Sequence, residues 1–248
     1  METEKSAYIT QIEVTDFLEK GQNLCLPLNE DVTVLAGDNG TGKTVLLSII
    51  EKVLMDNNMG RLKELFTSVV FHTSDIESPL VAVVDNYGCI TINGRHSTGN
   101  MWYINPRIIH STWSIISGRH FVEPKEKIVL FLDVVNSILC RFNIEARIVG
   151  LSLCFFRDNK EIYLSEGQSR LVLILLRAWS FPNLSYPLLL IDTPETFLHT
   201  NVQRILIESI RKINPNIQLL ITTHSPGILM NGGLNWIVNM KQILSKVE

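Results

Sequence analysis

The sequence predicts an α/β fold built around a mostly parallel sheet. Two strands composed almost entirely of apolar residues, 188–191 and 218–222, are separated by a segment with helical periodicity at 202–213. Strands that are apolar on both faces and alternate with helices are typical of parallel sheets covered on both sides. In addition, the apolar segment 32–36 runs through a glycine-rich turn into an amphipathic helix predicted at 45–54, which is the order of elements that such cores repeat.

The composition is that of a compact globular chain. Of its 248 residues 46% are hydrophobic and 19% are charged, and 22 basic against 25 acidic side chains leave a net charge of −3. This composition excludes an intrinsically disordered or collagen-like chain. The apolar stretches are shorter than the roughly 18 residues that cross a bilayer, and Met1–Ser6 lacks the apolar segment of a secretory signal. We therefore expect a cytoplasmic protein without a membrane partner.

The cysteines and histidines do not point to a metal site. The four cysteines, Cys25, Cys89, Cys140 and Cys154, include no C-x-x-C pair, and the six histidines include no H-x-x-x-H pair. Cysteines with this spacing and with apolar neighbours are predicted to be buried, reduced thiols and not a disulfide framework.

The remaining elements indicate one domain, 1–248, that contains an insertion. We assign residues 1–60 and 150–248 to the core of this domain and residues 61–149 to an inserted β and helical lobe. The early strands are expected to form an antiparallel β subdomain, and the helix at 123–142 a small helical lobe. Further strands are predicted at 7–15, 24–28, 68–71, 80–84, 89–92, 146–155 and 161–163, and a further helix at 171–179.

The glycine-rich turn has the complete pattern G-x-x-x-x-G-K-[ST], from Gly37 to Thr44. Between a strand and a helix, this pattern predicts a phosphate-binding loop whose backbone N–H groups surround the phosphates of a nucleotide. Lys43 would reach the β- and γ-phosphates, and the Thr44 hydroxyl would bind Mg²⁺. The predicted ATP-binding residues are Asn39, Gly40, Thr41, Gly42, Lys43, Thr44 and Val45. An ordinary glycine turn is the alternative, which the strand–loop–helix context disfavours.

A carboxylate follows the apolar strand at 188–191, at Asp192. Ligands of parallel sheets bind beyond the carboxyl ends of the strands, and carboxylate and hydroxyl oxygens are ligands that Mg²⁺ accepts. Many strands end in aspartate, but after a phosphate loop this position predicts that Asp192 and Thr44 hold the same magnesium ion.

A third motif, Leu-Ser-Glu-Gly-Gln at 164–168, precedes a long apolar helix. The Ser165 hydroxyl and the Gly167 N–H would lie at the positive end of that helix and could bind an anion. An ordinary helix N-cap by Ser165 is the alternative interpretation. Because the chain already has a phosphate loop, we expect Ser165 and Gly167 to bind a nucleotide held by another subunit.

The fourth motif is Thr-Thr-His-Ser-Pro at 222–226, directly after the second apolar strand. A histidine at that strand end can hydrogen-bond a γ-phosphate or the attacking water. A lone histidine would more often be a core residue, but His224 follows three companion motifs in order.

Together these motifs resemble the ATP-binding heads of ABC-type ATPases, and more closely the SMC, RecF and OLD-like branch of the AAA-type ATPases. The resemblance spans nearly the whole chain. It includes an opening strand at 9–17, Asp-x-Pro-Glu followed by Phe-Leu-His at 197–199 and by Gln203, and Ile-Leu at 228–229. It implies a P-loop NTPase fold with an ABC-ATPase-like head, and ATP with Mg²⁺ as the cofactors.

The resemblance also implies that ATP is sandwiched between two heads. Lys43 and Thr44 of one subunit would face Ser165 and Gly167 of the other, so that each copy completes its partner's site. We therefore expect a homodimer or heterodimer joined across ATP. His199 would either support the dimer-facing loop or begin a helix.

One departure from the family pattern concerns hydrolysis. Such families place a catalytic glutamate directly after the magnesium aspartate, where this chain has Thr193. A hydroxyl is too weak a base to replace it, and loss of a general base costs about 10²- to 10⁴-fold in rate. Glu195 matches the family's second acidic residue. We expect slow hydrolysis, with His224, Glu195 and Gln168 as the candidate catalytic residues.

The leading hypothesis is an ATP-gated dimeric regulator of a partner effector, such as a nuclease, in bacterial anti-phage defence or DNA repair. This link rests on the resemblance alone. The least favoured hypothesis is the nucleotide-binding subunit of a membrane transporter. Such subunits share the Leu-Ser-x-Gly-Gln motif with this chain, but not its Thr-Thr-His-Ser-Pro motif at 222–226.

Phe17 is a candidate contact for the adenine ring of ATP, although a core phenylalanine is the better interpretation of this residue.

The second hypothesis is an active DNA-repair ATPase that contacts DNA through residues 95–147. Residues 88–150 carry seven basic against four acidic side chains, interleaved with aromatic residues. Basic and aromatic side chains together can bind nucleic acid, but a solvated face with a few core aromatics explains the pattern equally well. The arginines tested first would be Arg107, Arg119 and Arg147.

Overall fold

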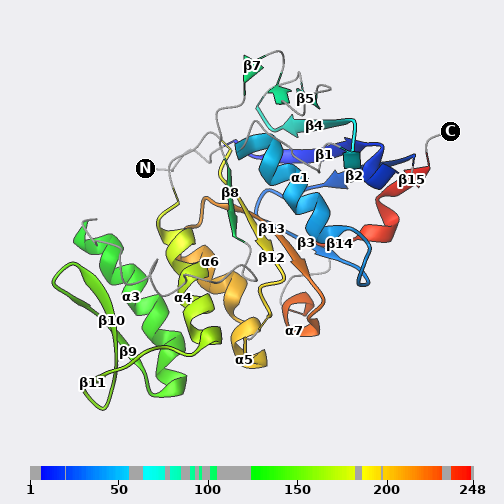
Figure 1. The fold of residues 1–248 in the computed structure, drawn as a ribbon. Helices are drawn as coiled ribbons and strands as arrows, with labels where there is room; N and C mark the ends of the chain where they lie inside the picture. The colour runs from blue at the N-terminus through cyan, green and yellow to red at the C-terminus, as the bar shows by residue number, and fades with distance from the viewer. Residues whose placement is uncertain are drawn as a thin grey trace.

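The computed structural model describes residues 7–19, 21–55, 64–75, 79–84, 90–92, 95–96, 101–104, 124–181, 186–196, 198–230 and 236–246. In these residues the chain forms a five-stranded sheet, a seven-stranded sheet and a helical lobe that carries a three-stranded sheet (Figure 1). No described helix is long and apolar enough to cross a membrane.

The five-stranded core sheet is parallel throughout and confirms the predicted fold class. Its order is β14-β3-β13-β12-β8, and every neighbouring pair runs in the same direction. The strands are β3 (Val32–Ala36), β8 (Met101–Ile104), β12 (Leu188–Asp192), β13 (Gln218–Thr223) and β14 (Ile237–Asn239). All residues of β12 and β13 are buried, which explains why both strands are almost uninterrupted apolar runs in the sequence.

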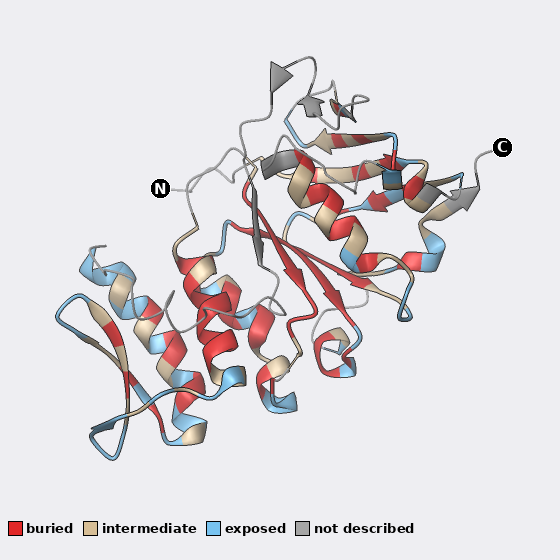
Figure 2. Cartoon of the chain, viewed as in Figure 1, coloured by how far each residue is buried: buried red, intermediate tan, exposed pale blue. Residues whose placement is uncertain are grey.

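Helices cover both faces of this sheet, and alternate residues of one strand enter different cores (Figure 2). Leu188 and Leu190 pack with α1 (Lys43–Met55) and the antiparallel sheet. Leu189 and Ile191 pack with the helices α3 (Lys125–Leu139), α4 (Glu166–Trp179) and α6 (Leu206–Ile213). This two-sided burial follows from the period of two along a strand. It holds the carboxyl ends of the strands, where the predicted site residues lie, on a rigid support.

The seven-stranded sheet is antiparallel and confirms the predicted β subdomain. Its order is β15-β2-β1-β4-β5-β6-β7. The strands are β1 (Ile9–Thr15), β2 (Gln22–Pro27), β4 (Ser68–Thr73), β5 (Leu80–Val84), β6 (Ile90–Ile92), β7 (Arg95–His96) and β15 (Leu244–Lys246). The last strand, β15, pairs with β2, so the two ends of the described chain meet in one sheet (Figure 1).

The helical lobe packs on the face of the core sheet opposite to α1 and the antiparallel sheet. Its helices are α3 (Lys125–Leu139), the 3₁₀ turn η3 (Cys140–Phe142), α4 (Glu166–Trp179) and α6 (Leu206–Ile213). The rings of Phe131 and Trp179 pack with their centroids 5.2 Å apart and join α3 to α4. The lobe also carries a small antiparallel sheet of β9 (Glu145–Val149), β10 (Ser152–Arg157) and β11 (Lys160–Glu161).

Two predicted elements are wrong in their extent. The strand predicted at 146–155 is two antiparallel strands, because Gly150 adopts a left-handed φ of 64° and reverses the chain between β9 and β10. The helix predicted at 202–213 is divided into α5 (Thr200–Gln203) and α6 by a break at residues 204–205. In addition, Met101–Ile104, which we assigned to the inserted lobe, is a strand of the core sheet beside β12.

The prediction that the cysteines are buried is also wrong for the three that the structure describes. Cys25 and Cys140 are exposed and Cys154 is partly exposed, while Cys89 lies outside the described residues. Cys25 alternates with buried residues along β2 and points to the outer face of an antiparallel sheet that packs on one side only.

Candidate functional site

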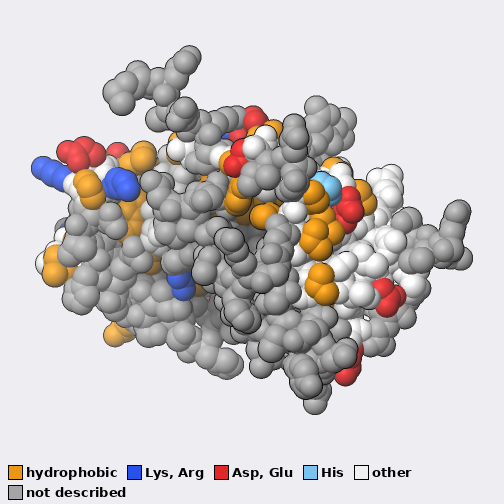
Figure 3. Space-filling view, turned by 90° about the horizontal axis from the view of Figure 1, so that it is seen from above, with side chains coloured by type: hydrophobic (Ala, Val, Ile, Leu, Met, Phe, Trp, Pro, Cys, Tyr) orange, Lys and Arg blue, Asp and Glu red, His pale blue; other side chains and the backbone are white. Residues whose placement is uncertain are grey.

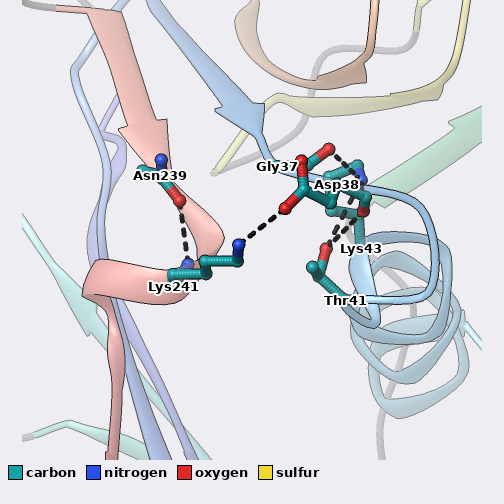
Figure 4. A network of polar contacts seen from close by, with 6 residues as sticks. All are labelled: Gly37, Asp38, Thr41, Lys43, Asn239 and Lys241. Atoms are coloured by element: carbon teal, nitrogen blue, oxygen red, sulfur yellow. Dashed lines mark hydrogen bonds and ion pairs between the residues drawn. The ribbon is translucent and has the colours of Figure 1, made fainter.

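The phosphate loop lies between the carboxyl end of β3 and the first turn of α1. Lys43 is buried, and its ammonium donates hydrogen bonds to the carbonyl oxygens of Gly37 (2.8 Å) and Asp38 (2.9 Å) (Figure 4). The loop encloses this charge because Gly40 and Gly42 adopt left-handed φ values of 78° and 93°. The predicted loop is therefore formed, with its lysine pointing into it.

The ring of Phe17 packs against this loop at Gly42. It is fully buried in the 3₁₀ turn η1 (Phe17–Glu19), and a Cβ at Gly42 would lie 2.9 Å from its ring. The interpretation of Phe17 as a core residue is thus confirmed, and Gly42 is needed for space as well as for its φ.

The two predicted magnesium ligands lie together at the carboxyl edge of the sheet. The Thr44 hydroxyl donates to both carboxylate oxygens of Asp192, at 3.0 and 3.2 Å. Asp192 is fully buried and also accepts a hydrogen bond from the hydroxyl of Thr222, its partner in the register of β12 and β13. A buried carboxylate beside a hydroxyl is a donor set that fits Mg²⁺.

Thr44 and Asp192 are enough protein ligands for a magnesium ion that is bound together with a nucleotide. In the described part of the chain, no group of three or more His, Cys, Asp or Glu side chains could hold a metal. Mg²⁺ in nucleotide sites commonly has only one or two protein ligands, and phosphates and water complete its shell. Thr44 and Asp192 would hold the ion in this way.

Thr193 occupies the position of the expected catalytic base in a strained conformation. Its φ is 46°, which is costly for a β-branched residue. Its backbone N–H donates to the carbonyl (2.9 Å) and hydroxyl (3.1 Å) oxygens of Thr222. The Thr193 hydroxyl is buried and has no hydrogen-bond partner among the described residues. A side chain held this way has no basic group to offer a water molecule.

Glu195, the nearest carboxylate after Asp192, contacts the histidine motif. Its Oε1 accepts a hydrogen bond of 2.7 Å from the backbone N–H of His224, and its Oε2 is buried without a partner in the described part of the chain. His224 itself is exposed just beyond β13. The structure thus brings two predicted catalytic residues together, with Glu195 bound to the backbone that carries His224.

Gln203 makes a second connection to the histidine motif. Its Oε1 accepts a short hydrogen bond from the Ser225 hydroxyl, and its Nε2 donates to the Leu198 carbonyl (2.7 Å). Ser225 in turn caps α7 (Pro226–Leu229) by accepting from the Gly227 N–H at 3.0 Å. Gln203 matches the pattern of the family that the sequence resembles, but nothing in its spacing along the chain predicts this contact.

The predicted anion site at Ser165 is a capped helix start. Ser165 begins α4, and its hydroxyl and the Gln168 side chain form a reciprocal capping box: Ser165 N–H donates to Gln168 Oε1 at 3.0 Å, and Gln168 N–H to Ser165 Oγ at 3.5 Å. These hydrogen bonds therefore agree with the alternative interpretation of Ser165 as an ordinary helix N-cap. Ser165 is nevertheless exposed at the positive end of a helix of 14 residues.

A small cavity of about 160 Å³ lies beside this helix start. One wall includes the Leu-Ser-Glu-Gly-Gln motif at 164–168, and the other includes residues of 198–202, which follow Asp192 in the chain. The lining residues are Phe142, Ser165, Gly167, Gln168, Leu171, Leu198, His199 and Val202. His199 caps α5, since its Nδ1 accepts from the Asn201 N–H at 3.3 Å, which agrees with the helix-start interpretation of this residue.

The C-terminal segment braces the phosphate loop, which the sequence did not predict. Lys241, in the 3₁₀ turn η5 (Met240–Gln242), forms an ion pair of 2.6 Å with Asp38 (Figure 4). The hydrogen bond from Lys241 and its charge lower the pKa of Asp38, and the same contacts raise the pKa of Lys241. Beside them, the fully buried Met240 lies 3.1 Å from where a Cβ at Gly37 would be.

The region proposed to contact DNA is only partly described. Arg107 and Arg119 lie outside the described residues. Arg147 contacts Glu145 through a short ion pair and lies over the ring of Phe156, 4.8 Å from its centroid. On the face seen in Figure 3 the lysine and arginine side chains of described residues lie at separate places.

The fold of this chain is similar to that of SMC head domains. Three solved structures of similar fold cover 94% of this chain: an SMC head bound to the C-winged helix domain of ScpA (TM-score 0.65, 15% identity, 93% of that chain), the SMC head domain from Thermotoga maritima (0.64, 14%, 94%), and the SMC head domain with an extended coiled coil bound to the C-terminal domain of ScpA from Pyrococcus furiosus (0.60, 13%, 93%).

The sequence itself matches one family model. Residues 150–231, which contain the motifs of Ser165, Asp192 and His224, match the family described as AAA domain, putative AbiEii toxin, Type IV TA system. A search of curated proteins gave no match.

Proposed function

We propose that this protein is an ATP-binding head that dimerises across ATP, hydrolyses it slowly, and thereby regulates a partner effector such as a nuclease. The observation that carries the proposal is the contact between Thr44 and Asp192 beside a formed phosphate loop. A magnesium nucleotide is held by a hydroxyl and a carboxylate of this kind, and the fold brings the two side chains together.

Nucleotide binding would use groups that now satisfy one another. The Lys43 ammonium would exchange the carbonyl oxygens of Gly37 and Asp38 for phosphate oxygens. Thr44 and Asp192 would exchange their mutual hydrogen bond for Mg²⁺, which when bound neutralises phosphate charge. The N–H groups of residues 39–45 at the start of α1 would surround the phosphates. His224 lies beyond β13 on the same edge and would contact the γ-phosphate.

Dimerisation would use the exposed start of α4. Ser165 and Gly167 lie on α4, which packs on one face of the core sheet, while the phosphate loop leads into α1 on the other face. A second copy of the chain, or a related head, would bring this helix start to the nucleotide. The likeness to SMC heads solved with ScpA domains supports a partner protein in general.

Slow hydrolysis is supported by the environment of Thr193 and of two of the candidate catalytic residues. Thr193, at the position where the family has its catalytic base, is 3% exposed and has no basic group. Glu195 is bound to the His224 backbone, and Gln168 is held in the capping box of α4. A long-lived ATP state would make the dimer a nucleotide-dependent switch and not a motor.

The setting we propose is cytoplasmic anti-phage defence. The description of the matching family as a putative AbiEii toxin of a type IV toxin–antitoxin system supports this setting over DNA repair. Arg147, the described member of the suggested DNA-binding arginines, is already engaged by Glu145 and Phe156.

The test is ATP turnover by the purified wild type and by Thr193→Glu, with Thr196→Glu in the same turn as the matched control. We expect little phosphate release from the wild type and an increase of about 100-fold for Thr193→Glu, because this variant restores a general base. Thermal melting checks that each variant folds. A wild type that hydrolyses as fast as Thr193→Glu contradicts slow hydrolysis.

A further inference from the structure

We infer that Lys241 sets the affinity of the phosphate loop for nucleotide by neutralising Asp38, a carboxylate that the loop itself carries. Without this lysine, the charge of Asp38 would repel the phosphates that the loop is proposed to bind. The inference rests on the proposed function, in which the loop binds ATP. It adds to that function a residue from the C-terminal segment of the chain that controls how tightly ATP is held.

The core sheet brings Lys241 to the phosphate loop. Strand β14 runs parallel to β3, and Asn239, its last residue, is paired with Ala36, the last residue of β3. Because the carboxyl ends of parallel strands meet at one edge, the turn after β14 lies beside the loop after β3. Lys241 therefore joins Asp192 of β12 and His224, which follows β13, at the same edge of the sheet.

The backbone of Lys241 is held in place by its neighbours. The Asn239 side chain caps the turn η5 by accepting a hydrogen bond of 3.0 Å from the Lys241 N–H. Met240 is fully buried, and its Cβ lies 3.1 Å from where a Cβ at Gly37 would be. With the turn fixed against the loop, the Lys241 ammonium points at the Asp38 carboxylate, 2.6 Å away (Figure 4).

Two lysines donate hydrogen bonds to Asp38 from opposite ends of the chain. The Lys43 ammonium donates to its backbone carbonyl at 2.9 Å, and the Lys241 ammonium to its carboxylate at 2.6 Å. The hydrogen bond and the charge of Lys241 lower the pKa of Asp38 most, and the charges of Lys43 and His224 lower it further. The Asp38 carboxylate thus lies within electrostatic reach of the two groups that we expect to contact phosphates.

This placement matters because a nucleotide brings more negative charge to the loop. Asp38 is the second residue of the phosphate-loop motif, and an uncompensated carboxylate there would oppose the attraction that Lys43 provides. The pair with Lys241 is exposed and contributes little to folding stability. Its effect on binding is larger, since one unit charge a few ångströms from a doubly charged phosphate changes the affinity about 5- to 10-fold even in water.

The test measures the affinity of the dilute subunit for ATP and for ADP, each with Mg²⁺, by calorimetric titration. The variants are Lys241→Met, Lys241→Arg, Asp38→Asn and the double variant of Asp38→Asn with Lys241→Met. The matched control is the exposed ion pair of 2.9 Å between Lys212 and Glu208 on α6, in which Lys212→Met and Glu208→Gln make the same changes of charge. Thermal melting checks that each variant folds.

We expect ATP to bind about 5- to 10-fold more weakly to Lys241→Met, which leaves Asp38 uncompensated, and about as much more tightly to Asp38→Asn, which leaves Lys241 uncompensated. The double variant loses both charges and should bind as the wild type, and so should Lys241→Arg, which keeps the charge. The loss in Lys241→Met should be smaller for ADP, which carries less charge. Lys212→Met and Glu208→Gln should leave the affinity unchanged.

Wild-type affinity in Lys241→Met would overturn the inference and leave the proposed function standing. A double variant that binds as weakly as Lys241→Met, or an equal loss for ATP and ADP, would do the same, because Lys241 would then act through packing and not through charge. A wild type that binds no ATP would overturn both proposals. If Lys241→Met does not fold, Asp38→Asn decides, and wild-type affinity in that variant overturns the inference.

Discussion

The phosphate loop and the start of α4 are both predicted to bind the phosphates of ATP, yet they are built in opposite ways. At the phosphate loop the charged groups are buried and hydrogen-bonded to neutral groups of the site: Lys43 is 5% exposed and Asp192 is fully buried. At the start of α4 the polar groups are exposed, and the helix satisfies its own end through the capping box of Ser165 and Gln168.

This difference indicates which half-site of the proposed dimer would depend on another molecule. The Lys43 ammonium donates to loop carbonyls and Asp192 accepts from the hydroxyls of Thr44 and Thr222, so a ligand can replace the Lys43 and Thr44 contacts without unfolding the site. The capped helix start offers a weak field and one hydroxyl, which is too little to hold a triphosphate alone. In the proposed dimer it would contribute only when a second surface delivers the nucleotide.

The comparison is tested most severely by Lys43→Ala. We expect ATP affinity to fall about 100-fold, because two charge-assisted hydrogen bonds to phosphate are lost. Lys52→Ala, on the last turn of the same helix, is the control and should bind as the wild type. Calorimetric titration with ATP and Mg²⁺ measures the effect. Equal affinity in Lys43→Ala and the wild type would show that the nucleotide binds elsewhere.

A smaller effect, confined to the dimer, is expected at Ser165. Ser165→Asp keeps a good N-cap for α4 but places a negative charge where the partner's triphosphate would arrive. We expect unchanged thermal stability and ATP affinity of the subunit, and ATP-dependent dimerisation weakened about 10-fold or more. Ser165→Asn, an equally good cap without the charge, is the control. If Ser165→Asp dimerises at the same ATP concentration as the wild type, the start of α4 is not part of the dimer interface.

The smallest effect is expected for the folding stability that the ion pair between Asp38 and Lys241 provides, since exposed pairs contribute little. Lys241 lowers the pKa of Asp38, so the pair stabilises the folded chain above the pKa of the unfolded aspartate, about 4, and this contribution is lost as pH falls through the lowered folded pKa. We therefore expect Lys241→Met to melt slightly below the wild type at pH 7, and the difference to shrink as the pH falls below about 4. A difference that stays constant as the pH falls would mean that Lys241 acts through packing and not through charge.

The sequence predicted the parts of the molecule whose physics is local or strongly periodic. The apolar runs at 188–191 and 218–222 identified the central strands, because strands buried on both faces must be apolar throughout. The phosphate loop was predicted because its glycines and lysine are required at fixed spacing. Asp192 followed, since strand ends of a parallel sheet meet at one edge.

The parts that the sequence did not predict depend on contacts between distant segments. Strands β14 and β15 are short, and only their pairing with β3 and β2 makes them strands. Lys241 contacts the phosphate loop across 203 positions of the chain, so no local pattern could reveal it. Gln203 has a role only because the turn after β13 returns beside α5.

Gly40 and Gly42 both belong to the phosphate loop, but glycine is required at the two positions for different physical reasons. No atom of the described residues lies within 4 Å of where a Cβ at Gly40 would be, so this position requires glycine only for its left-handed backbone. At Gly42 the ring of Phe17 fills that space, so the position selects for size as well. Asparagine, which tolerates a left-handed backbone, could therefore replace Gly40, whereas no larger residue fits at Gly42. The motif marks both positions as glycine and so does not show this difference.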